Sequence, residues 1–156
     1  MMLNEDYKDI LHALSAEKVK FLLVGAYAMA AHGYLRATMD IDIWIMPSPH
    51  NADAVFRALE LFGAPSHNLT KEDLQTDGVV FQIGVAPRRI DIITTASGLQ
   101  FEETYKRSAA IDIEGIEVHI PSIEDLICNK RASGRIKDMA DAEALESMRT
   151  GDDRQG

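Results

Sequence analysis

The chain has 156 residues, of which 46% are apolar and 26% are charged, and its formal net charge is −9. A chain of this length and composition can bury one hydrophobic core without disulfides or a structural metal, which excludes a largely disordered protein. The acidic excess argues against an extended nucleic-acid-binding surface, because such surfaces use Lys and Arg to neutralise phosphates. We therefore expect a single domain over residues 1–149 and a polar tail over residues 150–156.

Apolar runs and cysteine content indicate a cytoplasmic protein. The longest apolar run, residues 21–31, is about half the length that spans a bilayer, so we expect no membrane segment. Residues 1–10 are polar and acidic, unlike a secretion signal. The single cysteine, Cys128, cannot form an internal disulfide, which favours a reducing compartment, and we expect it to be a small buried side chain.

Helix and strand signals alternate through the first part of the chain. Residues 7–18 carry apolar side chains at helical spacing, and the short apolar run 20–24 ends at a glycine, as a buried strand would. Residues 26–32 are rich in Ala and Met and predict a second helix. Residues 40–45 alternate Asp with Ile, which predicts a strand with one acidic face, and a helix is expected over residues 48–62.

The second part of the chain continues this alternation with two hairpins. After a loop over residues 66–77, the β-rich runs 79–85 and 89–94 predict one hairpin, and the runs 110–113 and 116–120 predict another. The remaining expected helices cover residues 99–107, 123–131 and 135–148. Together these elements predict a mixed-sheet α/β or α+β domain.

Acidic side chains on two predicted strands form the candidate site. Asp40 and Asp42 are two residues apart, so strand geometry sends both to one face while Ile41 and Ile43 point into the core. Asp91 interrupts the apolar pattern of a second strand. Carboxylates that lie close together repel one another and offer hard oxygen ligands, which suit Mg²⁺ or Mn²⁺. We therefore predict that the three aspartates converge on a divalent-metal site.

Each aspartate taken alone also has a simpler interpretation. Asp40 and Asp42 would face solvent at the end of an amphipathic strand, and Asp91 would form an ion pair with Arg88 or Arg89. The combination of three acids with an upstream glycine turn favours the metal site. Gly25 ends a strand and opens a helix, which places free backbone N–H groups where a triphosphate can rest.

Four groups of residues, in this order, resemble motifs of the nucleotidyltransferase superfamily, especially its minimal and AbiEii-like branches. They are LLVGAYAMA at 22–30, RATMDIDI at 36–43, RIDII at 89–93, and a later set made of EDLI at 124–127, Lys130, Arg135, Lys137, Asp138 and Asp141. Each motif is degenerate by itself, but four in the right order over residues 20–145 are specific.

The resemblance implies a nucleotidyltransferase-like mixed sheet with C-terminal helices and a catalytic group of three aspartates. Asp40 and Asp42 would bind one or two Mg²⁺ or Mn²⁺ ions, and Asp91 would be the third ligand and the base. Residues in contact with the nucleoside triphosphate would be Gly25, Ala26, Tyr27, Arg36, Thr38, Lys130 and Arg135. For Arg36 and Thr38, bracing of the aspartate strand is an alternative role.

The later set of charged residues has an alternative role as well. Asp138 and Asp141 are neighbours on one helical face, where they would pair with Lys137 or Arg135 and take no part in chemistry. In that case Lys130 and Arg135 would be structural residues rather than phosphate ligands.

The implied reaction moves a nucleoside monophosphate from a triphosphate to a hydroxyl on a protein, an RNA end or a small molecule. Many members of the superfamily have a serine or threonine after the glycine, whereas this chain has Ala26 and Tyr27. The alternative is a catalytically weak or inactive nucleotide-sensing or interaction module, with a protein partner of the kind found in toxin–antitoxin pairs.

Overall fold

The structure is a computed structural model and describes residues 3–35, 40–85 and 88–155. Its helices are α1 (Glu5–Ala16), α2 (Gly25–Ala31), α3 (Pro49–Phe62), the 3₁₀ helix η1 (Asp73–Gln75), α4 (Phe101–Arg107), α5 (Ile123–Ser133) and α6 (Ile136–Gln155). Its strands are β1 (Phe21–Val24), β2 (Ile41–Ile45), β3 (Val80–Ile83), β4 (Ile90–Ile93), β5 (Ala109–Ile113) and β6 (Ile116–Ile120). The predicted mixed α/β class is confirmed.

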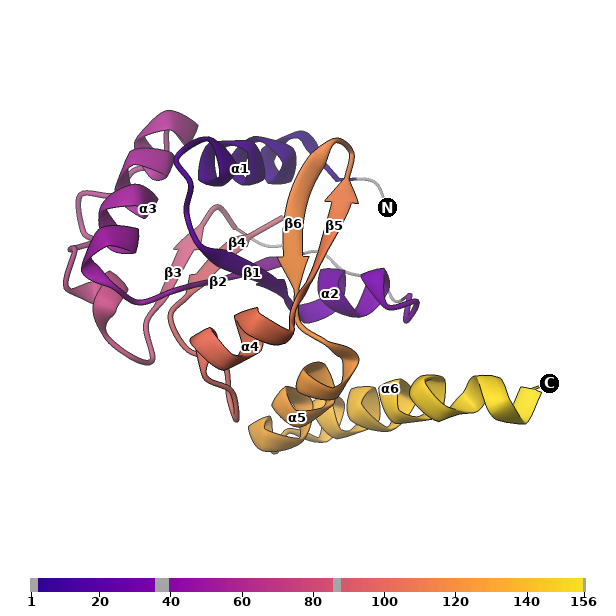
Figure 1. The fold of residues 1–156 in the computed structure, drawn as a ribbon. Coiled ribbons are helices and arrows are strands. Elements are labelled where there is room, and N and C mark those ends of the chain that lie inside the picture. The colour runs from indigo at the N-terminus through magenta and orange to yellow at the C-terminus, as the bar shows by residue number, and fades with distance from the viewer. Residues whose placement is uncertain (1–2, 36–39, 86–87, 156) are drawn as a thin grey trace.

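Two sheets organise the chain (Figure 1). The four-stranded sheet has the order β1-β2-β4-β3, in which β2 pairs antiparallel with β1 and parallel with β4, and β3 and β4 form the first predicted hairpin. The second hairpin, β5–β6, forms a separate two-stranded sheet, and β6 lies beside β1. The parallel pairing of β2 with β4 brings the two predicted acidic strands into contact.

The two faces of the central sheet differ in character. Ile41, Ile43 and Ile45 are fully buried in the main core, which they share with apolar residues of α1 and α3. On the opposite face of β2, Trp44 follows Asp42 at the strand period and packs edge-on against Phe101 of α4, with ring centroids 5.2 Å apart. This second face therefore carries acidic side chains at one end and an aromatic cluster at the other.

The structure differs from the sequence expectations in three places. Asp40 directly precedes β2 instead of beginning it. Helix α6 extends to Gln155, beyond the end expected near residue 148, and so includes most of the predicted polar tail; Thr150 Oγ1 donates to the Glu146 carbonyl at 3.1 Å. The buried position expected for Cys128 is wrong, since it lies on an exposed side of α5. No helix in the described part of the chain is long and apolar enough to cross a membrane.

The buried face of β2 predicts a large loss of stability on truncation. Replacing Ile43, which has no exposed area, with Ala should lower the free energy of unfolding by about 2–5 kcal/mol, because the cavity left behind cannot refill. The matched control is Leu61→Ala on α3, where 58% of the side chain is exposed and the loss should stay near or below about 0.5 kcal/mol. Urea denaturation measures both values, and equal losses would contradict this core assignment.

Candidate active site

The structure places the three predicted aspartates at one end of the two central strands. Asp42 of β2 is the register partner of Asp91 of β4, so their side chains emerge next to each other on the same face. Asp40, just before β2, accepts a hydrogen bond on Oδ1 from the Arg89 backbone N–H at 3.1 Å. Chain segments 49 residues apart are joined here.

Negative charge is in excess around Asp42. The pKa of its carboxyl group is raised to about 6, by burial first and then by the neighbouring carboxylates of Asp91 and Asp40, against the smaller opposing effects of Lys130 and Arg89. Burial and the two carboxylates both disfavour the ionised form of Asp42, and a cation at this position would favour it.

The guanidinium of Arg89 lies between two of the aspartates. Its Nε donates to Asp91 Oδ1 at 2.8 Å and its Nη2 to Asp91 Oδ2 at 3.2 Å, while Nη2 is also 3.2 Å from Asp40 Oδ2. Of the two ion-pair partners considered for Asp91, the structure selects Arg89. Over the described ranges, no group of three or more His, Cys, Asp or Glu side chains is arranged to hold a metal ion. In this conformation the carboxylates surround an arginine instead.

Gly25 is required by its contact with Asp42. Its φ of +68° is unfavourable for other residues, and a Cβ added there would lie 2.2 Å from Asp42 Oδ2. Gly25 also begins α2, and no side chain caps the N-terminus of that helix. Tyr27 takes a different position from Gly25 and Ala26: it is buried in the main core, where it packs edge-on against Tyr7.

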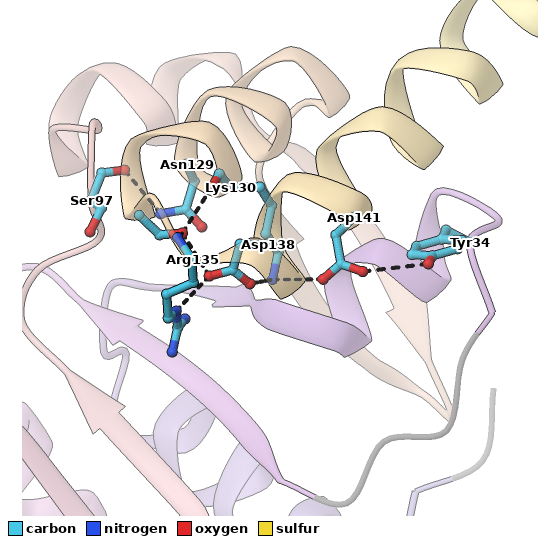
Figure 2. Close-up of polar contacts among 8 residues, drawn as sticks. Tyr34, Ser97, Asn129, Lys130, Arg135, Asp138 and Asp141 are labelled. Atoms are coloured by element: carbon cyan, nitrogen blue, oxygen red, sulfur yellow. Dashed lines mark hydrogen bonds and ion pairs between the residues drawn. The ribbon is translucent and has the colours of Figure 1, made fainter.

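Figure 2 shows a polar cluster at the junction of α5 and α6. Residues of this cluster line the same cavity as the three aspartates. Lys130 Nζ lies 3.2 Å from Asp138 Oδ1 and 3.4 Å from Asp141 Oδ2. Asp138 also accepts from Ser133 Oγ at 2.6 Å and from Arg135 Nε at 2.7 Å. Burial would raise the pKa of Asp138, but hydrogen bonds from Ser133, Lys130 and Arg135 outweigh it and lower the pKa to about 2. The result is an ionised carboxylate that fixes two cations.

One cavity of about 780 Å³ connects these features. Its described lining contains the three aspartates and most of the predicted nucleotide contacts, namely Gly25, Ala26, Asp40, Asp42, Asp91, Lys130 and Arg135. Arg89, Gln82 and Asn129 also line it. Arg36 and Thr38 lie outside the described residues. The structure therefore joins the strand, turn and helix motifs at a single opening, although they are far apart in the sequence.

Comparison with known proteins assigns this arrangement to a family. A family described as a nucleotidyltransferase of unknown function (DUF6036) matches residues 1–150. The chain belongs to this nucleotidyltransferase family. The resemblance found in the sequence is thus confirmed, and so is the enzyme class that it implied.

Solved structures of similar fold support the assignment. A candidate nucleotidyltransferase from Thermotoga maritima has a TM-score of 0.60 at 16% identity and covers 96% of both chains. The antibiotic-resistance factor ANT(2'')-Ia has a TM-score of 0.56 at 16% identity, covering 96% of this chain and 90% of its own. A second structure of ANT(2'')-Ia, in complex with adenylyl-2''-tobramycin, has a TM-score of 0.56 at 14% identity, covering 95% and 89%. Among curated proteins there is no match.

Some residues of the candidate site in this DUF6036 protein were not identified from the sequence. Ser133 donates to Asp138, and Asn129 Nδ2 donates to the Ser97 carbonyl at 3.0 Å, which fixes α5 to the loop after β4. Tyr34 OH donates to Asp141 at 3.4 Å. Asn129 and Ser133 lie within the α5–α6 segment, which was their only sequence signal, whereas Tyr34 is 107 residues from Asp141 and had none.

The contact of Gly25 with Asp42 predicts a specific coupling. Gly25→Ala should cost at least about 1 kcal/mol more than Gly115→Ala, because both residues have positive φ but a Cβ at Gly115 would have nothing within 4 Å. In an Asp42→Ala background this excess should disappear, since the colliding oxygen is gone. Chemical denaturation of wild type, the three single variants and the two double variants with Asp42→Ala gives the coupling. An excess that persists without the Asp42 carboxylate would contradict the contact.

The low pKa of Asp138 predicts how stability depends on pH. Because this group ionises more easily in the folded than in the unfolded state, its contribution is present above about pH 4 and is lost as the pH falls through about 2. Asp138→Asn should therefore destabilise the protein by about 2 kcal/mol at pH 6, and the difference from wild type should shrink towards pH 3. Urea midpoints measured across this range test it. Asp53→Asn, at an exposed ion pair with Lys71, should show only a small difference.

Proposed function

We propose that this protein transfers a nucleoside monophosphate from a nucleoside triphosphate to a hydroxyl group, with the help of Mg²⁺ or Mn²⁺. The observation that carries the proposal is the shared cavity, in which Asp40, Asp42 and Asp91 face Gly25 and Lys130. Membership of a nucleotidyltransferase family supports the reaction class. ATP is the natural first nucleotide to test, because ANT(2'')-Ia is seen with an adenylylated product.

The chemistry of the aspartates fits a divalent ion. Three carboxylates supply the hard oxygens that Mg²⁺ and Mn²⁺ prefer, and burial and the two neighbouring carboxylates raise the pKa of Asp42, an effect that a cation beside it would oppose. Asp40, Asp42 and Asp91 are the residues that would hold the ion. When bound, it would neutralise charge on the phosphates and orient the reacting oxygen.

The protein's own residues supply the rest of the proposed mechanism. Backbone N–H groups at the start of α2 and the ammonium of Lys130 would bind the phosphates, with Arg135 at the exposed rim of the cavity. An acceptor hydroxyl would form a bond to the α-phosphorus as the α–β phosphate bond breaks and pyrophosphate leaves. Asp91 would hold the proton that the hydroxyl loses.

The acceptor would enter from the side of β3 and β4. Val80, Gln82 and Thr95 line this part of the cavity and leave it partly apolar, with polar groups that can orient a hydroxyl. Of the three acceptor classes expected from the sequence, a small hydroxyl-bearing molecule is favoured, because ANT(2'')-Ia shares the fold and is seen with adenylyl-2''-tobramycin. Protein side chains and RNA ends are the other acceptors to test.

A second candidate function is a nucleotide-sensing or interaction module that transfers little or nothing. It is favoured by Ala26, which provides no hydroxyl at the phosphate turn, and by Arg89, which holds two of the aspartates. In that case the protein would act through a partner protein, as in toxin–antitoxin pairs, and binding would not depend on the aspartates. A cytoplasmic location suits both candidates.

A transfer assay separates the two candidates. Protein incubated with α-labelled NTPs, Mg²⁺ and cell extract should label an acceptor, and Asp42→Asn should reduce labelling at least about 100-fold, because a group that stabilises the transition state is lost. The control Asp53→Asn changes an exposed aspartate of α3 that pairs with Lys71, so its labelling should equal that of wild type. If wild type labels no more than Asp42→Asn, transfer is excluded and the interaction module is retained.

A further inference from the structure

The main chain of Arg89 is fixed while its side chain faces the cavity. Its carbonyl accepts from the Ile41 N–H at 3.0 Å and from Tyr7 OH at 3.2 Å, and its own N–H donates to Asp40. The side chain lines the 780 Å³ cavity and is 31% exposed. Any rearrangement of Arg89 therefore involves the side chain alone, which has open space to move into.

The guanidinium already occupies oxygens that a metal ion would need. It uses both carboxylate oxygens of Asp91 and contacts Oδ2 of Asp40, at distances of 2.8 to 3.2 Å. A divalent ion bound to these oxygens would lie next to the positive charge of the guanidinium, and the two cations would repel each other. Arg89 and the metal therefore cannot share the aspartates in this arrangement.

We propose that Arg89 is the internal counter-ion of the aspartates, that a divalent ion displaces its guanidinium, and that the released side chain then binds the phosphates of the nucleotide. The inference rests on the proposed function, because it uses the same metal and nucleotide site. Arg89 would alternate between two partners, the aspartate carboxylates and the nucleotide phosphates. Arg89 would be a positioning residue for the metal and a phosphate-binding residue for the nucleotide.

The cavity makes the second partner available. Lys130 and Gly25, the proposed phosphate contacts, line the same opening as Arg89. A guanidinium freed from carboxylates forms bidentate hydrogen bonds to phosphate equally well. Metal binding would thus prepare a nucleotide contact, and by linkage the nucleotide would tighten the metal by the same factor.

Metal affinity tests the first half of the proposal. Mn²⁺ binding is followed by the loss of the free-ion electron paramagnetic resonance signal, without nucleotide. Arg89→Gln should bind Mn²⁺ about tenfold more tightly than wild type, because the competing cation is gone. The matched control is Arg57→Gln, which removes an exposed arginine paired with Glu17 on the other side of the sheet and should leave Mn²⁺ affinity unchanged.

Nucleotide affinity tests the second half. Calorimetry with a non-hydrolysable ATP analogue should show that Mn²⁺ increases nucleotide affinity in wild type and that this increase is at least about tenfold smaller in Arg89→Gln. Arg89→Lys, which keeps the charge without the bidentate geometry, should give an intermediate value.

Thermal denaturation provides a measurement that is independent of enzymatic activity and of the two binding experiments. In the presence of a chelator, Arg89→Gln should melt below wild type, since Asp40 and Asp91 have lost their counter-ion, and Mn²⁺ should raise its Tm more than that of wild type. Equal Mn²⁺ affinity in wild type and Arg89→Gln would overturn the competition and leave the proposed transferase function intact. Absence of Mn²⁺ binding in both proteins would overturn the metal-dependent function together with this inference.

Discussion

The parallel register between β2 and β4 is the constraint on which the site depends. Ile41 and Ile43 on one strand and Ile90 and Ile92 on the other are buried in register, and a slip by one residue would move these side chains out of the core. Since side chains alternate along a strand, the same register sets the aspartates next to each other on the opposite face. The position of the acidic group is therefore fixed by apolar packing rather than by any attraction between the acids, which repel.

Repulsion among the aspartates accounts for much of the surrounding structure. Arg89 balances Asp40 and Asp91 directly, and Lys130 acts on Asp42 from the facing helix. Lys130 is in turn held by Asp138 and Asp141, so opposite charges alternate from the sheet to α6. The C-terminal helices thus carry a cation to the site and supply the buried carboxylates that keep it in place.

Much of the fold could be predicted from the sequence because its signals are local. Alternation within residues 110–120 predicted both strands of the second hairpin, and Ser122 predicted the start of α5. The contact partners of individual side chains were harder to predict from the sequence, because they depend on strand register and on rotamers. The choice between Arg88 and Arg89 as partner of Asp91, the core position of Tyr27 and the exposure of Cys128 all required the three-dimensional packing. Arg36 and Thr38 remain predictions.

The role of Gly25 changes how the neighbouring Ala26 is interpreted. At Gly25 the absence of a side chain is required by Asp42, whose carboxylate occupies the space that a Cβ would fill. The Asp42 carboxylate imposes this requirement on position 25, whether or not the next residue carries a hydroxyl group. Ala26 therefore lacks a hydroxyl but leaves the geometry of the aspartates unaffected. Lys130, Arg135 and Arg89 line the same cavity, and under the proposed function these cations would bind the phosphates in place of that hydroxyl. The proposed transfer therefore depends on the three aspartates and the cations around the cavity, all of which are present, and not on a hydroxyl at position 26.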